Sequence, residues 1–116
     1  MKKLEKHVLG IVQGARVLFS DFEDDGEMWT GHGPRSKVTH IRFAEPFLTT
    51  SVVHVALEMI DMDSGSNQRA DISASNVSRD GFDIVFKTWG DSRVARARAS
   101  WLVLGEVRGS DEWDVD

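Results

Sequence analysis

The chain has 116 residues, a formal net charge of −5 and no cysteine. A chain of this length fits a single domain that can bury a core without disulfide bridges, and 41% apolar with 28% charged residues is a typical globular composition. The lack of cysteine excludes a disulfide, a thiol nucleophile and a thiolate metal site. The negative charge argues against nucleic acid as a partner, because phosphate neutralisation needs the opposite balance.

The N-terminus begins like a signal peptide, but polar residues interrupt its apolar run and no small-residue cleavage site follows. No stretch approaches the ~18 apolar residues of a membrane span, so we expect a cytoplasmic protein or part of an exported particle. Residues 1–11 are predicted to be an N-terminal arm or an entry segment. Leu4, Val8 and Ile11 have the spacing of a coiled-coil seam, whereas Gly10 and the β-branched residues after it favour a strand.

Apolar and polar residues alternate along most of the chain with a period of two, which predicts β-strands. The pattern is clearest in 81–103, where two alternating runs flank the polar corner Thr88-Trp89-Gly90-Asp91-Ser92. Further strands are predicted at 15–19, 37–43, 51–60 and 69–77. In the run 51–60, the residues expected to share one face are Val53, Val55, Leu57 and Met59.

About six strands separated by turn signals, with no convincing interior helix, predict an all-β antiparallel sandwich or barrel over residues 12–106. An acidic tail follows at 107–116. The longest loop signal is 23–34, which holds three glycines, a proline and an acidic cluster. Loops of this kind often carry binding residues, because their side chains are not used in packing.

No pattern in the sequence supports a metal site. Asp61, Asp63 and Asn67 alternate oxygen ligands as a calcium loop does, but the glycine between them is misplaced for an EF-hand and the twelfth residue is Ile72. A solvated turn is the preferred interpretation. The four histidines share no zinc-ligand spacing. We expect neither a metal nor a cofactor.

Catalysis has no positive signal either. No Gly-x-Ser-x-Gly turn or phosphate-binding glycine loop occurs, and the carboxylates are scattered through loops, so we predict that the chain is not an enzyme. Arg93, Arg96 and Arg98 form a basic ridge on one strand. We expect this ridge to pair with acidic residues of a neighbouring strand or a second subunit; nucleic-acid binding is the alternative.

A polar and aromatic group remains, consisting of Gly31 and His32 in the long loop, Arg69 after a turn, and Trp89 and Gly90 at the corner. Sugars present hydroxyls that favour charged partners, and an apolar ring face that packs on an aromatic side chain. Arg69 and Trp89 offer these two contacts. The group is therefore the predicted sugar-binding site.

Short blocks that follow one another over nearly the whole chain resemble the H-type lectin domain, the family of the snail agglutinin and discoidin type. The blocks are Val12-Gln13-Gly14, Asp24-Asp25 before Trp29, Ile41-Arg42-Phe43-Ala44-Glu45-Pro46-Phe47, Val52-Val53, Ile60-Asp61 to Asn67-Gln68-Arg69, Gly81-Phe82, Thr88-Trp89 and Ser100-Trp101. The resemblance implies a six-stranded antiparallel β-sandwich that assembles as a trimer or hexamer. It also implies sites for galactose or N-acetylgalactosamine at the clefts between subunits.

By position, Arg69 matches the family's sugar-binding arginine and Trp89 its site tryptophan, contributed by neighbouring subunits. The chain departs from the snail pattern at three positions of the sugar site. His32 lies near the position of the snail protein's aspartate, Gly90 replaces its histidine, and Ala95 replaces its tyrosine. Losing a charge-assisted contact lowers affinity about tenfold or more. Classical N-acetylgalactosamine binding is therefore expected to be weakened, and galactose-type, N-acetylgalactosamine-type or related sugars remain the predicted ligands.

The family's bridging half-cystines are replaced here by Phe22 and Phe86, which implies a phenylalanine pair in the core. The first functional hypothesis is a carbohydrate-binding module that gains avidity by presenting several sites at once. The alternative is a structural assembly module, in a phage-like particle or surface appendage, with a degenerate sugar site. Gly90, Ala95 and the possible N-terminal seam favour this alternative.

Overall fold

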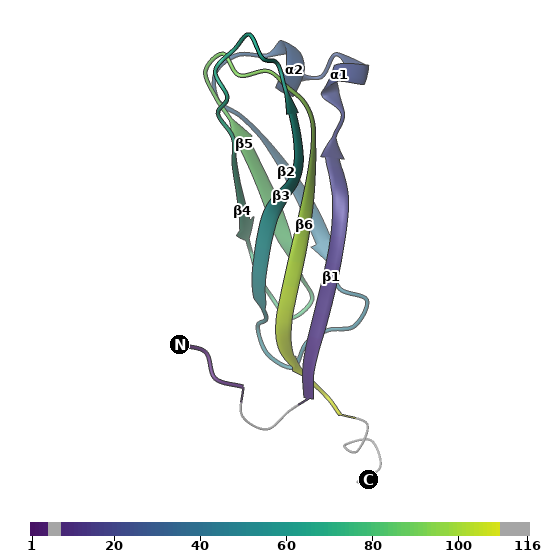
Figure 1. Cartoon of the computed structure of the whole chain (residues 1–116). Helices are drawn as coiled ribbons and strands as arrows, with labels where there is room; N and C mark the ends of the chain where they lie inside the picture. Colours follow the sequence, from purple (N-terminus) through teal and green to yellow (C-terminus); the bar gives the residue numbers. More distant parts are fainter. Residues whose placement is uncertain (5–7, 110–116) are drawn as a thin grey trace.

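The computed structural model describes residues 1–4 and 8–109. Within them, six strands and two single-turn helices form two antiparallel sheets, ordered β1-β6-β3 and β2-β5-β4. In chain order the elements are β1 (Val8–Phe19), α1 (Asp21–Asp24), α2 (Glu27–Thr30), β2 (Arg35–Arg42), β3 (Val52–Met62), β4 (Asp71–Ser75), β5 (Gly81–Thr88) and β6 (Val94–Val107). Figure 1 shows the sheets packed face to face, with both helices at one end. The predicted six-stranded antiparallel sandwich is confirmed.

The two alternating runs around the polar corner become β5 and β6, the central strand of each sheet. On β5, Phe82, Ile84 and Phe86 are fully buried, because every second side chain of a strand points to the same face. On β6, Ala97 and Val103 are buried in the same way. Each central strand forms backbone hydrogen bonds with two neighbouring strands. The corner that joins β5 to β6 is therefore held at both ends by a strand paired on both sides.

Aromatic side chains from both sheets pack against one another within the core. The rings of Phe19 and Phe86 meet edge to face at 5.1 Å, and those of Phe82 and Trp101 at 6.1 Å. Phe43 lies 5.9 Å from Phe82 and extends the contact along the sandwich. Burying one large side chain contributes roughly 1.5 to 3 kcal/mol. Packing of this kind therefore supplies the stability of a chain without disulfides.

The implied pairing of Phe22 with Phe86 is wrong. Phe22 is 58% exposed and packs edge-on against Trp29, 5.4 Å between ring centroids, because it lies on α1 rather than on a strand. Phe19, the last residue of β1, contacts Phe86 instead. The predicted loop at 23–34 likewise contains short helical turns.

The predicted apolar face of β3 is correct for its first three residues and wrong for the fourth, Met59. Val53, Val55 and Leu57 pack against the core, but Met59 does not, and Met62 takes the next core position. A β-bulge between Leu57 and Met59 shifts the register by one residue, which moves the following side chains to the other face. Alternation alone cannot locate such a bulge.

The strands extend past the predicted sandwich boundaries at both ends. Strand β1 begins at Val8, and β6 ends at Val107. Val8 and Ile11 therefore belong to a strand, and the coiled-coil seam through them is excluded. Leu4 lies outside any element, and residues 5–7 lie outside the described part of the chain.

The basic ridge pairs with acidic residues of the adjacent strand, as expected. Arg96 Nη2 lies 3.2 Å from Asp61 Oδ2, and Arg98 Nε lies 2.9 Å from Glu58 Oε1. Arg93 departs from the ridge because its Nε donates to the Trp29 carbonyl, and its guanidinium lies 4.1 Å from the Trp29 ring centroid. The ridge therefore serves cross-strand pairing within one chain.

Gly81 at the start of β5 allows a close approach of two backbones. A Cβ at this position would lie 2.2 Å from the Ile41 carbonyl oxygen, a backbone atom that cannot move aside cheaply. We predict that Gly81→Ala lowers the free energy of unfolding by about 1 to 3 kcal/mol, measured by urea denaturation. The matched control Gly65→Ala should be near neutral, because its Cβ would meet only an ordinary contact at 3.5 Å. Equal effects of the two substitutions would contradict this reading.

Candidate functional site

Three connections meet at the end of the sandwich where the helices lie. They are the segment between β1 and β2, the β3–β4 loop and the β5–β6 corner; Figure 1 shows all three at the top of the molecule. Backbone hydrogen bonds tie them together: Gly33 N–H donates to the Gly90 carbonyl at 2.9 Å, and Asp63 N–H donates to the Arg93 carbonyl at 3.0 Å. The predicted site residues thus come from loops that support one another.

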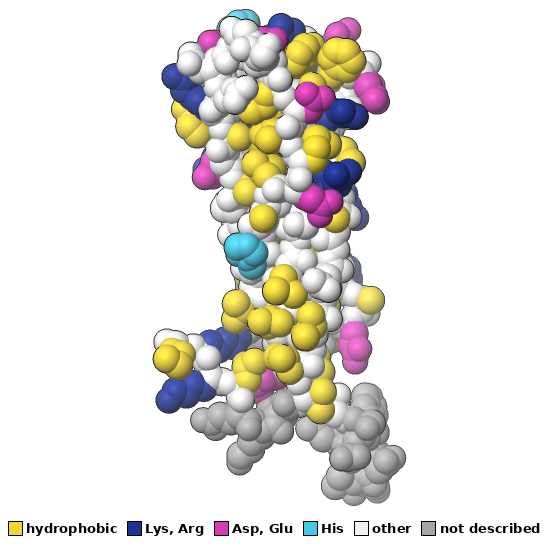
Figure 2. All heavy atoms as spheres, in the orientation of Figure 1, with side chains coloured by type: hydrophobic (Ala, Val, Ile, Leu, Met, Phe, Trp, Pro, Cys, Tyr) yellow, Lys and Arg dark blue, Asp and Glu magenta, His cyan; other side chains and the backbone are white. Residues whose placement is uncertain are grey.

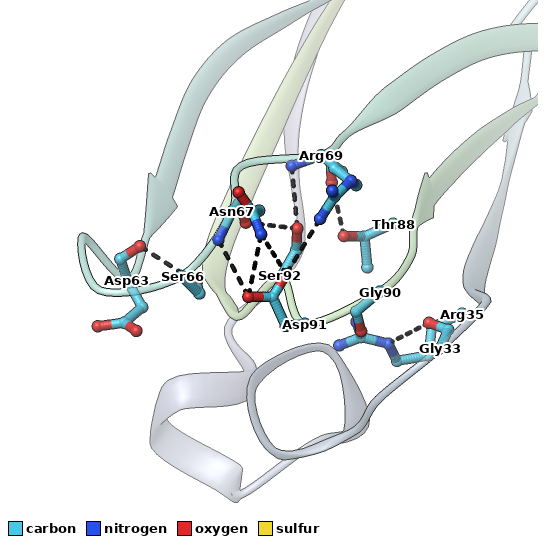
Figure 3. A network of polar contacts seen from close by, with 10 residues as sticks. All are labelled: Gly33, Arg35, Asp63, Ser66, Asn67, Arg69, Thr88, Gly90, Asp91 and Ser92. Atoms are coloured by element: carbon cyan, nitrogen blue, oxygen red, sulfur yellow. Dashed lines mark hydrogen bonds and ion pairs between the residues drawn. The ribbon is translucent and has the colours of Figure 1, made fainter.

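Arg69 and Asp91 form an ion pair at the centre of this end. Arg69 Nη1 lies 3.0 Å from Asp91 Oδ1, and both side chains are partly exposed, at 39% and 52%. Asn67 donates to the same carboxylate from its side chain, at 3.1 and 3.3 Å, and from its backbone N–H at 3.3 Å. Figure 3 shows the three side chains turned toward one another. The result is an oriented guanidinium beside an oriented carboxylate, both open to solvent.

Two buried hydroxyls fix the backbone beneath this pair. Ser92 Oγ accepts from Arg69 N–H at 2.9 Å and donates to the Asn67 carbonyl at 2.6 Å. Thr88 Oγ1 donates to the Arg69 carbonyl at 2.6 Å. Both residues are almost fully buried, so these bonds are shielded from competing water. The β3–β4 loop is therefore bonded to both sides of the β5–β6 corner.

Gly90 occupies the turn of the corner with φ of +67°, a conformation that favours glycine. A Cβ there would lie 3.2 Å from Arg69 Nη1. A larger residue would therefore strain the backbone and also crowd the guanidinium. The loss of the family's histidine at this position is consistent with how closely Arg69 approaches the corner in this chain.

Trp89 points to the other side of the corner. It lines a cleft of about 310 Å³ with Pro34, Arg35, Ser36, Lys87 and Thr88, and its side chain is half-exposed. Arg69 does not line this cleft. Strands β2 and β4 flank β5 on opposite sides, so Trp89 sits over β2, whereas Arg69 lies two residues before the start of β4.

Gly31 and His32 lie beside the corner without contacting Arg69. A Cβ at Gly31 would lie 2.5 Å from the Glu27 carbonyl oxygen, so this glycine permits the tight end of α2. His32 is exposed, and its ring has no hydrogen bond to any described residue. The structure thus gathers all five predicted residues at one end, but it gives Gly31 a packing reason to be glycine.

Asp91 and Asn67 carry polar groups that sequence reasoning did not assign to the site. The corner was predicted to take part in binding, yet its aspartate received no role, because a Gly-Asp-Ser sequence is also ordinary turn chemistry. Ser92 and Thr88 also received no role, because serine and threonine hydroxyls are common in turns. Only the pairing of the β3–β4 loop with the corner, a contact between residues more than 20 positions apart, reveals them.

The carboxyl group of Asp91 is held ionised. Hydrogen bonds from the Asn67 side chain, then from the Asn67 backbone, lower the pKa of Asp91 below its ordinary value of 3.8, and the charge of Arg69 adds a smaller effect. A depressed pKa means that the interaction is present above pH 3.8 and is lost as pH falls through the lowered value.

We therefore predict a titration midpoint below 3.8 for Asp91, measured by the pH dependence of its carboxyl carbon resonance in NMR. Asn67→Ala should raise the midpoint, because it removes the side-chain bond that contributes most. A midpoint at or above the ordinary value in the unaltered protein would show that the Asn67 bonds do not persist in solution.

The described residues offer no group of three or more histidine, aspartate or glutamate side chains that could hold a metal ion. Among them there is also no helix long and apolar enough to cross a membrane. What the loop end provides is a hydrogen-bonding guanidinium and carboxylate on one side of the corner and an aromatic cleft on the other. These are groups suited to binding a polar ligand.

Comparison with known structures identifies the fold. Discoidin II of Dictyostelium discoideum superposes with a TM-score of 0.73 at 21% identity, over 84% of this chain and 37% of the discoidin chain. A second structure of discoidin II gives a TM-score of 0.75 at 20% identity, over 90% and 40%. The chain therefore corresponds to less than half of that longer protein.

Sequence relatives point the same way. One of the discoidin-1 polypeptides of Dictyostelium discoideum is 32% identical over 80 residues, which is 68% of this chain and 32% of that protein. The product named ATP synthase subunits region ORF 7 of Fuscovulum blasticum is 53% identical over 108 residues, 93% of this chain and 94% of its own length. The match with this second relative therefore covers almost all of both chains.

A family model assigns the domain. The model described as H-type lectin domain matches residues 38–103, a segment that includes Arg69, Trp89 and the whole β5–β6 corner. The resemblance noted in the sequence is thereby confirmed, and it identifies a carbohydrate-binding type of module rather than an enzyme type. The chain belongs to the H-type lectin domain family.

Proposed function

We propose that this protein is a lectin for galactose- or N-acetylgalactosamine-type sugars, with its sites at clefts between the subunits of a trimer. The observation that carries the proposal is the exposed Arg69 guanidinium, held in place by Asp91 and by the buried hydroxyls beneath it. Neighbouring hydroxyls of a sugar accept hydrogen bonds from a guanidinium and donate to a carboxylate. A prearranged pair of this kind binds without first being ordered.

Asp91 can supply the carboxylate that is missing at the position of His32. The snail-type site uses a carboxylate, and His32 offers none. Asp91 places a carboxylate next to Arg69 from the opposite loop, half-exposed and ionised at neutral pH. We therefore assign hydroxyl binding to Arg69 and Asp91 together, with Trp89 as the surface on which the sugar ring packs.

The positions of Arg69 and Trp89 support a site shared between subunits. The two residues lie on opposite sides of β5, and Trp89 opens onto a cleft that Arg69 does not line. A sugar held by both side chains is most simply accommodated where the Arg69 side of one copy faces the Trp89 side of the next.

The outer face of the β1-β6-β3 sheet supplies a surface for such an assembly. Ile11, Leu104 and Val52 are directly opposite one another across the three strands, and Gln13, Leu102 and His54 form the next row. We call these two rows the assembly face. Figure 2 shows hydrophobic side chains over both the upper and the lower part of the sheet, with both signs of charge among those of the upper part and few charges among those of the lower part. Apolar patches of this kind typically mark protein interaction sites.

Mixing two defective variants tests the shared site. Arg69→Ala and Trp89→Ala are each expected to lose retention on a galactose or N-acetylgalactosamine column. After the two are unfolded together and refolded, about one cleft in four should combine an intact Arg69 with an intact Trp89 from the next subunit. Recovered retention that free sugar reverses is the expected result. No recovery, despite mixed trimers shown by native mass spectrometry, would place both residues in one subunit's site.

One observation favours the alternative of a structural assembly module. Ala95, at the position of the family's site tyrosine, is 5% exposed and presents no side chain to a ligand, and Gly90 presents none either. A trimer that binds no sugar on an array, neutral or acidic, would support that alternative. Sugar-dependent retention that Arg69→Ala removes would exclude it.

A further inference from the structure

The cleft under Trp89 contains a buried positive charge that has no acidic partner. Arg35 is only 7% exposed. Its Nε donates to the Gly33 carbonyl at 2.9 Å, its Nη1 to the Glu27 and Met28 carbonyls at 3.2 Å, and its Nη2 to the Gly90 carbonyl at 3.3 Å. Figure 3 shows the guanidinium on the far side of Gly90 from Arg69. All four acceptors are neutral carbonyls, and no carboxylate of the described residues pairs with it.

A second cation lines the same cleft. Lys87 precedes Thr88 at the end of β5, and its side chain has neither an ion pair nor a hydrogen bond to any described residue. Asp71 of β4 is opposite Lys87 of β5, but the two do not form an ion pair. Strand β4 lies on the side of β5 away from the cleft. The lining residues thus include two positive charges and no negative one.

The rest of the lining suits a substituted ring. Trp89 and Pro34 provide apolar surface, and the Ser36 hydroxyl adds a hydrogen-bonding group. The volume of about 310 Å³ lies at the lower end of the range for small-ligand pockets. An anion bound here would meet the field of a guanidinium that is largely shielded from water, where charge interactions are stronger than at a free surface.

We propose that this cleft binds an anionic substituent of the glycan, so that the protein prefers acidic sugars to their neutral counterparts. The inference rests on the proposed sugar-binding function and specifies its ligand class. Trp89 carries the sugar ring, and Lys87 together with Arg35 receives the oxyanion. A carboxylate and a sulfate ester both fit this chemistry.

Matched sugars separate the two anions. The probes are methyl galactoside, methyl galacturonide and galactose 6-sulfate, titrated against the whole protein by calorimetry. We expect at least one acidic sugar to bind about three- to tenfold more tightly than the neutral one, and this preference to shrink as salt is raised. The stronger of the two identifies the anion.

Lys87→Gln isolates the charge without touching the buried Arg35. It should remove most of the preference for the acidic sugar and leave the affinity for the neutral sugar within about twofold. Arg42→Gln is the control, because Arg42 is an exposed cation at the other end of β2, six positions beyond Ser36. It should change neither affinity.

The outcomes separate this inference from the proposed function. Neutral sugar bound as tightly as both acidic sugars, or an acidic preference that survives Lys87→Gln, would overturn the anionic cleft and leave the lectin assignment standing. The absence of binding by all three sugars, in a protein shown to be folded, would overturn both.

Discussion

Replacing Arg69 by alanine is expected to reduce sugar affinity by roughly 10- to 150-fold, the equivalent of about 1.5 to 3 kcal/mol for a lost charge-assisted contact. The guanidinium is the donor that the site presents to sugar hydroxyls. Its loss also removes one partner of Asp91. The backbone bonds from Ser92 and Thr88 to residue 69 do not depend on the side chain, so the loop should keep its course. Calorimetry with the best sugar from an array gives the affinity directly.

The control for Arg69→Ala is Arg42→Ala, which removes an exposed arginine far from the loop end. This variant should retain full affinity, and both variants should keep the melting temperature and the native mass of the unaltered protein. Unchanged affinity in folded Arg69→Ala would remove Arg69 from the site. An equal loss in both variants would indicate a non-specific charge effect.

Placing a charge on the assembly face is expected to produce the second large effect. In Leu102→Asp, an unpaired carboxylate would be buried on the central strand β6 when copies associate. Such a charge costs several kcal/mol, which corresponds to association weakened by about 100-fold or more. Leu102 is already 36% exposed in the single chain, so the fold should tolerate the change. Sedimentation velocity over a range of concentrations should then show monomer in place of trimer.

Val38→Asp is the matched control for Leu102→Asp. Val38 is also an exposed apolar residue in the middle of a strand, but it lies on the other sheet. Its replacement should leave the oligomer intact. The Leu102→Asp monomer should in addition lose binding to surfaces coated with sugar, because multivalent presentation raises apparent affinity by about 10² to 10⁴. An undisturbed trimer would show that this face is not the interface.

Much of the fold can be predicted from the alternation of residues, because a sandwich buries every second side chain of each strand. Phe82, Ile84 and Phe86 are buried as the pattern requires. The bulge before Met59 could not be predicted, since it depends on how β3 is accommodated along β6. Phe22 was misplaced because α1 turns the chain away from the core just after β1.

The candidate site could be predicted only in part, because it depends on contacts between loops distant in sequence. Arg69 and Trp89 could be selected from the sequence as a hydrogen-bond donor and an aromatic surface, and the structure bonds the backbone of Arg69 to the corner that contains Trp89. Asp91 contacts Arg69, and Trp89 lines a cleft with Arg35. Both arrangements depend on how loops distant in sequence pack together. Residue type gives no information on such pairings, and Asp91 and Arg35 were therefore identified only from the three-dimensional arrangement.

A glycan array on the purified protein, read together with its native mass on the same sample, decides whether the protein is a multivalent lectin. We expect a trimer or hexamer that binds a defined set of terminal galactose- or N-acetylgalactosamine-type sugars, and an Arg69→Ala variant of the same mass that binds none of them. An oligomer of normal mass with no glycan bound above background would contradict the lectin function.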